Sequence, residues 1–162
     1  MTAISNSSVL IALSTIGQLQ LLNQRFPSGI LLPQAVWREV VETGAGQPGS
    51  EEISSASWLT VREVANKPLV SALRIDLDEG EAEAIALFTE QPGEAILLDE
   101  KNARRVARQM GLPILGTVGI LIWAKRTGLI PTLKEQLDLL QSQGKFRLSQ
   151  ILYQEALKKV GE

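Results

Sequence analysis

Two carboxylates in this sequence, Glu81 and Asp99, occupy positions that we predict to be buried. Glu81 follows the start of a predicted helix, and at about 100° per residue it falls on the apolar side with Ile85 and Phe88, whereas Glu83 points to the other side. Asp99 ends the predicted strand AILLD. The four residues before it are apolar, as in buried parallel strands. A carboxylate in such a place ionises only if a cation or a water-filled cleft receives it. The pair therefore suggests a divalent-metal site at the carboxyl edge of a parallel sheet.

Two residue types are absent from the sequence, and their absence limits the reactions that the protein can catalyse. The chain has no His, which excludes imidazole acid–base catalysis, Ser-His-Asp triads and nearly all catalytic zinc sites. It also has no Cys, so it has neither a disulfide framework nor thiolate chemistry. Carboxylates, hydroxyls, Lys and Arg remain, and such oxygen donors favour hard cations.

Length and composition favour one α/β domain with a full core, since the chain has 162 residues and 44% hydrophobic content. The net charge of −2 argues against a non-specific nucleic-acid coat protein but leaves room for a local basic groove. The longest apolar runs are far too short to span a membrane, and no signal peptide is evident. We therefore expect a cytoplasmic protein.

The chain alternates predicted strands and helices. Strands are expected at residues 2–5, 30–33, 57–64, 95–99 and 112–115. Helices are expected at residues 9–22, 34–42, 51–56, from Gly80 onward, after Asp99, at 118–128, and twice in the tail at 131–144 and 148–161. Ser7 or Ser8 is the expected N-cap of the first helix and Ser149 that of the last. A short connector, Lys145-Phe146-Arg147, joins the two tail helices.

Three further polar residues lie at strand-to-helix junctions or near them. Asn6 follows the first strand at the carboxyl edge, where open α/β folds bind ligands, although it could serve only in a helix cap. Glu39 lies on the boundary of the helix after the second strand and could either reach a cleft or remain solvated. Thr117 begins the helix after the last strand and could add a hydroxyl to the same cleft.

A basic helix face follows Asp99. Lys101, Arg104, Arg105 and Arg108 share this face, with Ala103, Val106 and Met110 opposite. Cations this close to a metal-site carboxylate could hold the phosphates of an RNA strand. The alternative is an ordinary solvated helix face.

The chain resembles the PIN-domain family, in particular the PIN-like proteins related to VapC-type toxins. The resemblance rests on six blocks in order: SNSSVLIALSTIGQLQLL, LLPQAVWREVV, LDEGEAEAIAL, ILLDEKNARRVARQMGL, GTVGILIWAKRTGLI and GKFRLSQILY. It implies a three-layer α/β/α sandwich with a central parallel sheet, and acids at the carboxyl edge that hold Mg²⁺ or Mn²⁺ for RNA cleavage. Carried over one by one, these acids fall on Asn6, Glu39, Glu81 and Asp99, with Asp78 and Glu100 as nearby reserves.

Asn6 departs from the family pattern, because an amide oxygen can ligate a hard cation but brings no negative charge. We predict a ribonuclease with Glu39, Glu81 and Asp99 as catalytic residues and Asn6, Glu81 and Asp99 as metal ligands. A PIN-like module that binds RNA or a protein without cutting is the alternative. A phosphatase-like hydrolase is a third hypothesis. That class usually needs a nucleophilic aspartate at the end of the first strand, and this chain has Asn6 there.

The domain and partner predictions also follow from the resemblance. Residues 1–162 are expected to form a single PIN-like domain with a C-terminal helical extension at about 131–162. The family implies RNA as substrate, a small cognate antitoxin and a homodimer. The apolar helical segments 118–124 and 148–157 could form the dimer interface or simply belong to the core.

Overall fold

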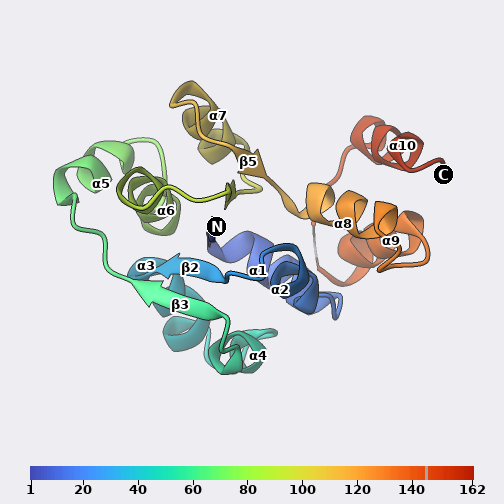
Figure 1. The fold of residues 1–162 in the computed structure, drawn as a ribbon, viewed down its shortest axis with the longest axis horizontal. Coiled ribbons are helices and arrows are strands. Elements are labelled where there is room, and N and C mark those ends of the chain that lie inside the picture. The colour runs from blue at the N-terminus through green and yellow to red at the C-terminus, as the bar shows by residue number, and fades with distance from the viewer. Residues whose placement is uncertain (145) are drawn as a thin grey trace.

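The computed structural model describes residues 1–144 and 146–162, and its centre is a five-stranded parallel sheet (Figure 1). The strands are β1 (Ala3–Ser5), β2 (Ile30–Pro33), β3 (Leu59–Arg62), β4 (Ala95–Leu97) and β5 (Ile114–Leu115). Their order across the sheet is β3-β2-β1-β4-β5, and every pair is parallel. The predicted α/β fold with a central parallel sheet is confirmed.

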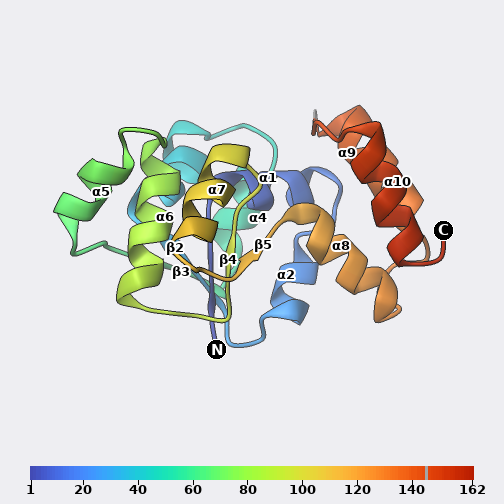
Figure 2. The ribbon, with the colours of Figure 1, turned by 90° about the horizontal axis from the view of Figure 1, so that it is seen from above.

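Helices cover both faces of the sheet. They are α1 (Ser7–Thr15), α2 (Gln20–Arg25), α3 (Gln34–Trp37), the π-helix η1 (Arg38–Thr43), α4 (Ser50–Ser55), α5 (Lys67–Leu73), α6 (Glu79–Glu90), α7 (Lys101–Gln109), α8 (Thr117–Arg126), α9 (Leu133–Gln143) and α10 (Gln150–Lys159). Figures 1 and 2 place α8, α9 and α10 together at one end of the molecule and α5 and α6 at the other. No helix in the described residues is long and apolar enough to cross a membrane.

Alternation along the strands divides the core into two layers. Ala3 and Ile30 pack on one face with residues of α1, α2, α8 and α9, whereas Ile4 and Leu31 pack on the other with residues of α5, α6 and α7. Because successive strand residues point to opposite faces, an apolar run such as Ala95 to Leu98 fills both layers at once. This two-sided burial is why β4, an inner strand of the sheet, is wholly apolar, and it produces the α/β/α sandwich.

The strand order fixes where a ligand can bind. β2 lies on one side of β1 and β4 lies on the other, so the connections leaving β1 and β4 diverge at their carboxyl ends. Such a switch point opens a crevice at that edge of a parallel sheet. Asn6 directly follows β1, and Asp99 follows β4 by two residues, so both lie at this crevice.

The first helical segment differs from its prediction. The expected helix over residues 9–22 is two helices, because Gly17 adopts a left-handed conformation with φ of 72°. The N–H of Gly17 donates to Ser14 O at 3.0 Å and that of Gln18 to Leu13 O at 2.8 Å, which is the Schellman pattern that ends a helix. The apolar periodicity continues across the break because both helices face the same core.

Two other local predictions were wrong or incomplete. Neither Ser7 nor Ser8 caps α1: Asn6 occupies the N-cap position, and its side chain makes no capping hydrogen bond. The short helix α5 was not predicted, although Asn66 caps it and Pro68 stands in its first turn. Ser149 does cap α10, accepting from the N–H of Leu152 at 3.2 Å, as predicted. Of the predicted connector between α9 and α10, Lys145 lies outside the described residues.

Candidate active site

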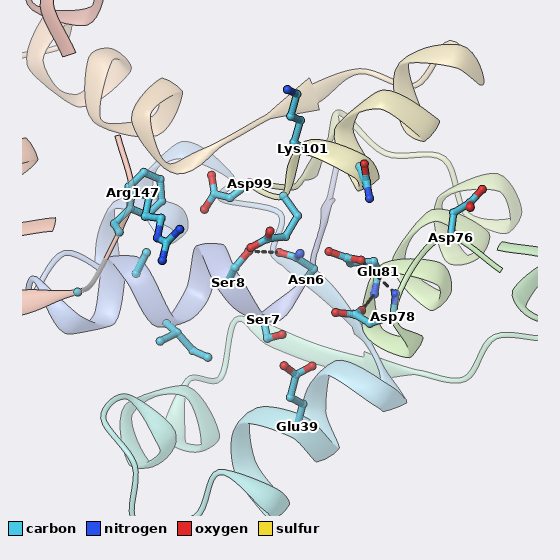
Figure 3. A pocket seen from close by; sticks show the side chains of 16 residues that line it. Asn6, Ser7, Ser8, Glu39, Asp76, Asp78, Glu81, Asp99, Lys101 and Arg147 are labelled. Carbon is cyan, nitrogen blue, oxygen red and sulfur yellow. Dashed lines mark hydrogen bonds between the residues drawn. The ribbon is translucent and has the colours of Figure 1, made fainter. Parts of the chain in front are cut away.

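A cleft of about 950 Å³ opens at the switch point of the sheet. Side chains of Asn6, Glu39, Glu81 and Asp99 all line it, and so do those of the two reserve acids, Asp78 and Glu100. Figure 3 shows these residues around one hollow, with Glu39 reaching it from the side opposite Lys101. The structure therefore brings together all four residues that the sequence placed at the carboxyl edge. We call this hollow the acid cleft.

Asp99 is held from one side by Thr117. The backbone N–H of Thr117 donates to Oδ1 of Asp99 at 2.8 Å, and its hydroxyl donates to Oδ2 at 2.6 Å. Burial raises the pKa of the Asp99 carboxyl, while the two bonds from Thr117 and the charge of Arg104 oppose that rise. Thr117 is fully buried, so its hydroxyl is a fixed donor to Asp99 and does not face the cleft itself.

Glu81 is held by the start of its own helix. Asp78 caps α6 by accepting from the N–H of Glu81 at 2.8 Å, and Oε1 of Glu81 accepts from the N–H of Asp78 at 3.1 Å. This reciprocal capping box fixes the carboxylate in position. Burial is the main reason that the pKa of Glu81 is raised, and the negative charges of Asp78, Glu100 and Glu39 raise it further. Glu81 is therefore surrounded by like charge and would gain from a cation.

Asn6 and Glu39 differ in their surroundings. Asn6 is 3% exposed, its N–H donates to Leu97 O at 3.2 Å, and its Oδ1 accepts from the Ser8 hydroxyl at 3.1 Å (Figure 3). Glu39 is exposed, and its side chain has no hydrogen bond or ion pair within the described residues. Asn6 is thus buried and held by hydrogen bonds, whereas Glu39 is exposed and makes no such bond in the described residues.

The segment that carries Glu39 is braced against α6. Glu83 accepts from the N–H of Ala35 at 3.1 Å, so the side chain on the other side of α6 anchors the first turn of α3. A Cβ atom on Gly80 would lie 3.2 Å from Oε2 of Glu39, so this carboxylate lies close to the first turn of α6. Glu39 lies in the π-helix η1, a wider helix form that often occurs at functional sites.

The donor set of the acid cleft fits a hard divalent cation in its chemistry. It offers carboxylate and amide oxygens and no nitrogen or sulfur ligand, which is the composition that Mg²⁺ and Mn²⁺ prefer. Within residues 1–144 and 146–162, however, no three acid side chains approach one another closely enough to enclose an ion directly. Mg²⁺ keeps several waters in such open sites, so the residues fit an ion held partly through water.

The residues of the predicted basic face of α7 differ in their exposure and contacts. Lys101, Arg105 and Arg108 are exposed, and Lys101 lines the acid cleft. Arg104 is half-buried and donates from Nη1 to Leu98 O at 2.8 Å, so its guanidinium braces the end of β4 beside Asp99. On the opposite side, Ala103 is buried, but Met110 is 39% exposed because α7 ends at Gln109. Met110 therefore does not pack inward as the pattern predicted.

Several residues that line the acid cleft were not predicted from the sequence, and three of them bear a charge or an aromatic ring. Asp76 lies at the Asp78 end of the acid cleft, and Arg147 reaches it from the connector between α9 and α10 (Figure 3). Phe146, from the same connector, also lines the cleft. Asp76 is part of a local acid-rich run that could have been included. Phe146 and Arg147 reach the cleft only because the tail helices fold back beside α8, and no local pattern encodes that return.

Comparison with known proteins agrees with this geometry. A family model described as a PIN domain matches residues 2–162. No curated protein matches the chain. PIN domains are usually nucleases that use divalent metals, which is consistent with an acid-lined cleft at the switch point of a parallel sheet. The match spans nearly all of the sequence, and the chain therefore belongs to the PIN-domain family.

Proposed function

We propose that the protein is a ribonuclease of the toxin-like PIN type that depends on Mg²⁺ or Mn²⁺ and hydrolyses phosphodiester bonds of RNA. The observation that carries this proposal is the pair of carboxylates at the switch point, Glu81 and Asp99. Both are substantially removed from water, both have a raised pKa, and both line the same cleft. Carboxylates kept in such a costly state are typical of functional sites.

Asn6, Glu81 and Asp99 would hold the ion, directly or through water. When bound, a divalent cation makes a water more acidic and offsets the charge that develops on the phosphate. Thr117 and the capping box of α6 keep the two carboxylates in place, so little rearrangement is needed on binding. Glu39 is exposed, unbonded in the described chain and lines the same cleft, and it would accept the proton of the attacking water.

Cations on one side of the acid cleft would position the substrate. Lys101 and Arg147 both line it, and Figure 3 shows them on the same side as Asp99. A phosphate bound there would have its charge matched by the two side chains, next to the ion that Asp99 would hold. Arg105 and Arg108 extend the positive surface along α7, outside the cleft.

The test is cleavage of single-stranded RNA by the purified protein with Mg²⁺ and then with Mn²⁺. Asp99→Asn keeps the shape of the side chain and should abolish metal-dependent cleavage. Glu135→Gln changes an exposed acid on α9 that does not line the cleft, and it should cleave like the wild type. Cleavage that survives in Asp99→Asn would contradict the proposed site.

A second candidate function is an RNA- or protein-binding module without activity. Two observations favour it: Asn6 brings no charge, and no three acids converge within the described residues. This module would bind RNA, show weak divalent-ion affinity and cut nothing even with Mn²⁺. A phosphatase-like hydrolase would instead act on a small phosphate ester and not on RNA, so one assay with each substrate separates all three functions.

A further inference from the structure

A second cavity adjoins the acid cleft. It has a volume of about 470 Å³ and is bounded by β5, α8 and α10. Three residues line both hollows: Asp99, Phe146 and Arg147. The two cavities therefore adjoin at the carboxylate that the proposed reaction uses. We call the second cavity the side groove and define it by its apolar lining residues, which include Leu115, Val118, Ile122, Leu148 and Leu152.

Phe146 stands at the junction of the two cavities. Its N–H donates to Leu140 O at 3.1 Å, at the end of α9, and Gln141 Nε2 donates to Leu148 O at 3.3 Å. These bonds tie the backbone of Phe146 and Leu148 to α9. Phe146 itself is half-buried, so part of the ring is accessible where the hollows meet. An aromatic ring fixed at such a junction is a surface on which a nucleobase can stack.

The charged residues that line the side groove are mainly cationic. Its basic residues are Arg104, Arg147 and Lys159. Its acidic residues are Glu155 and Asp99, which also lines the acid cleft. The guanidinium of Arg104 already donates a hydrogen bond to Leu98 O. The charged groups of Arg147 and Lys159 have neither an ion pair nor a hydrogen bond in the part of the chain that the structure describes. Two cations without a partner in the described residues and a set of apolar side chains in one cavity match the two parts of a nucleotide, its phosphate and its base.

We propose that the side groove is a base-binding subsite for single-stranded RNA. It receives the base of a nucleotide next to the phosphate in the acid cleft. Phe146 and the apolar walls contact the base, and Arg147 contacts the backbone. This inference rests on the proposed function, because it takes the acid cleft as the phosphate site. A paired base cannot leave its stack to enter the groove without disrupting the duplex, so the subsite selects single strands.

The experiment measures binding without chemistry. A fluorescein-labelled single-stranded RNA is titrated with the metal-free protein, and fluorescence anisotropy gives the affinity. A set of oligonucleotides, each with one abasic nucleotide, then finds the position whose base contributes. We expect one position to weaken binding about tenfold, in line with the contribution of one stacked base, and a duplex of the same sequence to bind more weakly than the single strand.

Two neighbouring residues of α10 provide a matched pair of variants. Leu152 lines the side groove and is 55% exposed, whereas Ile151 does not line it and is 71% exposed. Leu152→Asp should weaken binding of the intact RNA about tenfold and should remove the penalty of the abasic position. Ile151→Asp adds the same charge to the same helix and should leave both values near those of the wild type. Circular dichroism confirms that both variants are folded.

The outcomes separate the two proposals. If the wild type cleaves RNA but no abasic position matters, or if the penalty persists in Leu152→Asp, the base-binding subsite is wrong while the nuclease stands. If Leu152→Asp binds the RNA as tightly as the wild type does, the side groove does not bind RNA and the proposal is overturned. A protein segment would then be the remaining occupant. If the abasic penalty is found but no RNA is cut, the proposed nuclease function fails and the subsite stands.

Discussion

Thr117 donates two hydrogen bonds to the carboxylate of Asp99, one from its backbone and one from its hydroxyl. Both bonds favour the ionised acid and oppose the rise in its pKa that burial causes. The hydroxyl is fully buried and comes from a different strand-to-helix junction than Asp99 does. The charge state of the central carboxylate therefore depends on the packing of α8 against the end of β4.

We predict that Thr117→Val shifts the acid limb of the pH–rate profile for RNA cleavage to higher pH. Valine keeps the shape but removes the hydroxyl donor, so the pKa of Asp99 rises and the carboxylate is lost at a higher pH than in the wild type. The rate on the acid limb should fall about tenfold, since a hydrogen bond to a charged group contributes about 1.5–3 kcal/mol. Thr117→Ser keeps the hydroxyl and serves as the control. Superimposable profiles for the valine variant and the wild type would refute this role.

We predict that Glu81→Gln stabilises the metal-free protein at neutral pH. The pKa of Glu81 in the folded protein is raised above 4.5, so the folded state binds this proton more tightly than the unfolded state does. The unfolding free energy of the wild type therefore falls as the pH rises from 4.5 through the raised pKa, and it remains lower above it. Glutamine stays neutral and still accepts the capping-box bond from Asp78.

Thermal melts in the presence of a chelator test this stability prediction. The melting temperature of Glu81→Gln should exceed that of the wild type at pH 7.5, and the gap should close toward pH 4.5. Each kcal/mol corresponds to roughly 2–4 °C for a chain of this size. Glu63→Gln, which changes an exposed acid of the loop after β3, should show no such pH-dependent gain. A gap that is constant with pH would mean that packing and not charge is responsible.

Two adjacent arginines should separate into different roles. Arg104 braces Leu98 O and its charge lowers the pKa of Asp99, whereas Arg105 is exposed on α7. We predict that Arg104→Gln shifts the acid limb of cleavage to higher pH. Arg105→Gln should leave the pH profile unchanged and only weaken RNA binding, with a shallower dependence on salt, because one phosphate contact is lost. The same shift in both variants would show that the two charges act alike.

The parts of the site that the sequence predicted are those fixed by local pattern. Helical periodicity placed Glu81 on the buried side of α6, and an apolar run placed Asp99 at the end of β4. Thr117 was found in the same way, at a strand-to-helix junction, although its hydroxyl serves Asp99 and not the cleft. The parallel sheet also followed from alternating strands and helices. These features depend on residues within about one turn or one strand of each other, which is why a single sequence reveals them.

The parts that were missed depend on contacts between distant segments. Phe146 and Arg147 reach the acid cleft through the return of the tail helices, and Arg104 turns to a carbonyl that only the end of β4 provides. Glu39 was chosen mainly from the resemblance, because its π-helix turn has no sequence signal. The break at Gly17 was missed since the apolar pattern runs through it, although a glycine after a helix is itself a stop signal.

Asn6→Asp tests the position at which an amide stands where the resemblance implies an acid. Asn6 lies at the N-terminus of α1, where the helix dipole favours a negative charge, and its Oδ1 already accepts from Ser8. An aspartate can keep that bond while adding a charge to the acid cleft. We predict that affinity for Mg²⁺, measured by calorimetry, increases about tenfold, because a full carboxylate attracts a divalent ion far more strongly than an amide does.

The same substitution should destabilise the metal-free protein, since Asn6 is nearly buried and the added charge would lie in a cleft already lined by acids. Asn102→Asp is the matched control, because Asn102 lines the same cleft but is exposed. If Asn102→Asp raises Mg²⁺ affinity as much as Asn6→Asp does, the gain comes from net charge alone and Asn6 is not a ligand position. A gain confined to Asn6→Asp, together with faster RNA cleavage, would mean that the amide limits the wild-type enzyme by weakening its hold on the ion.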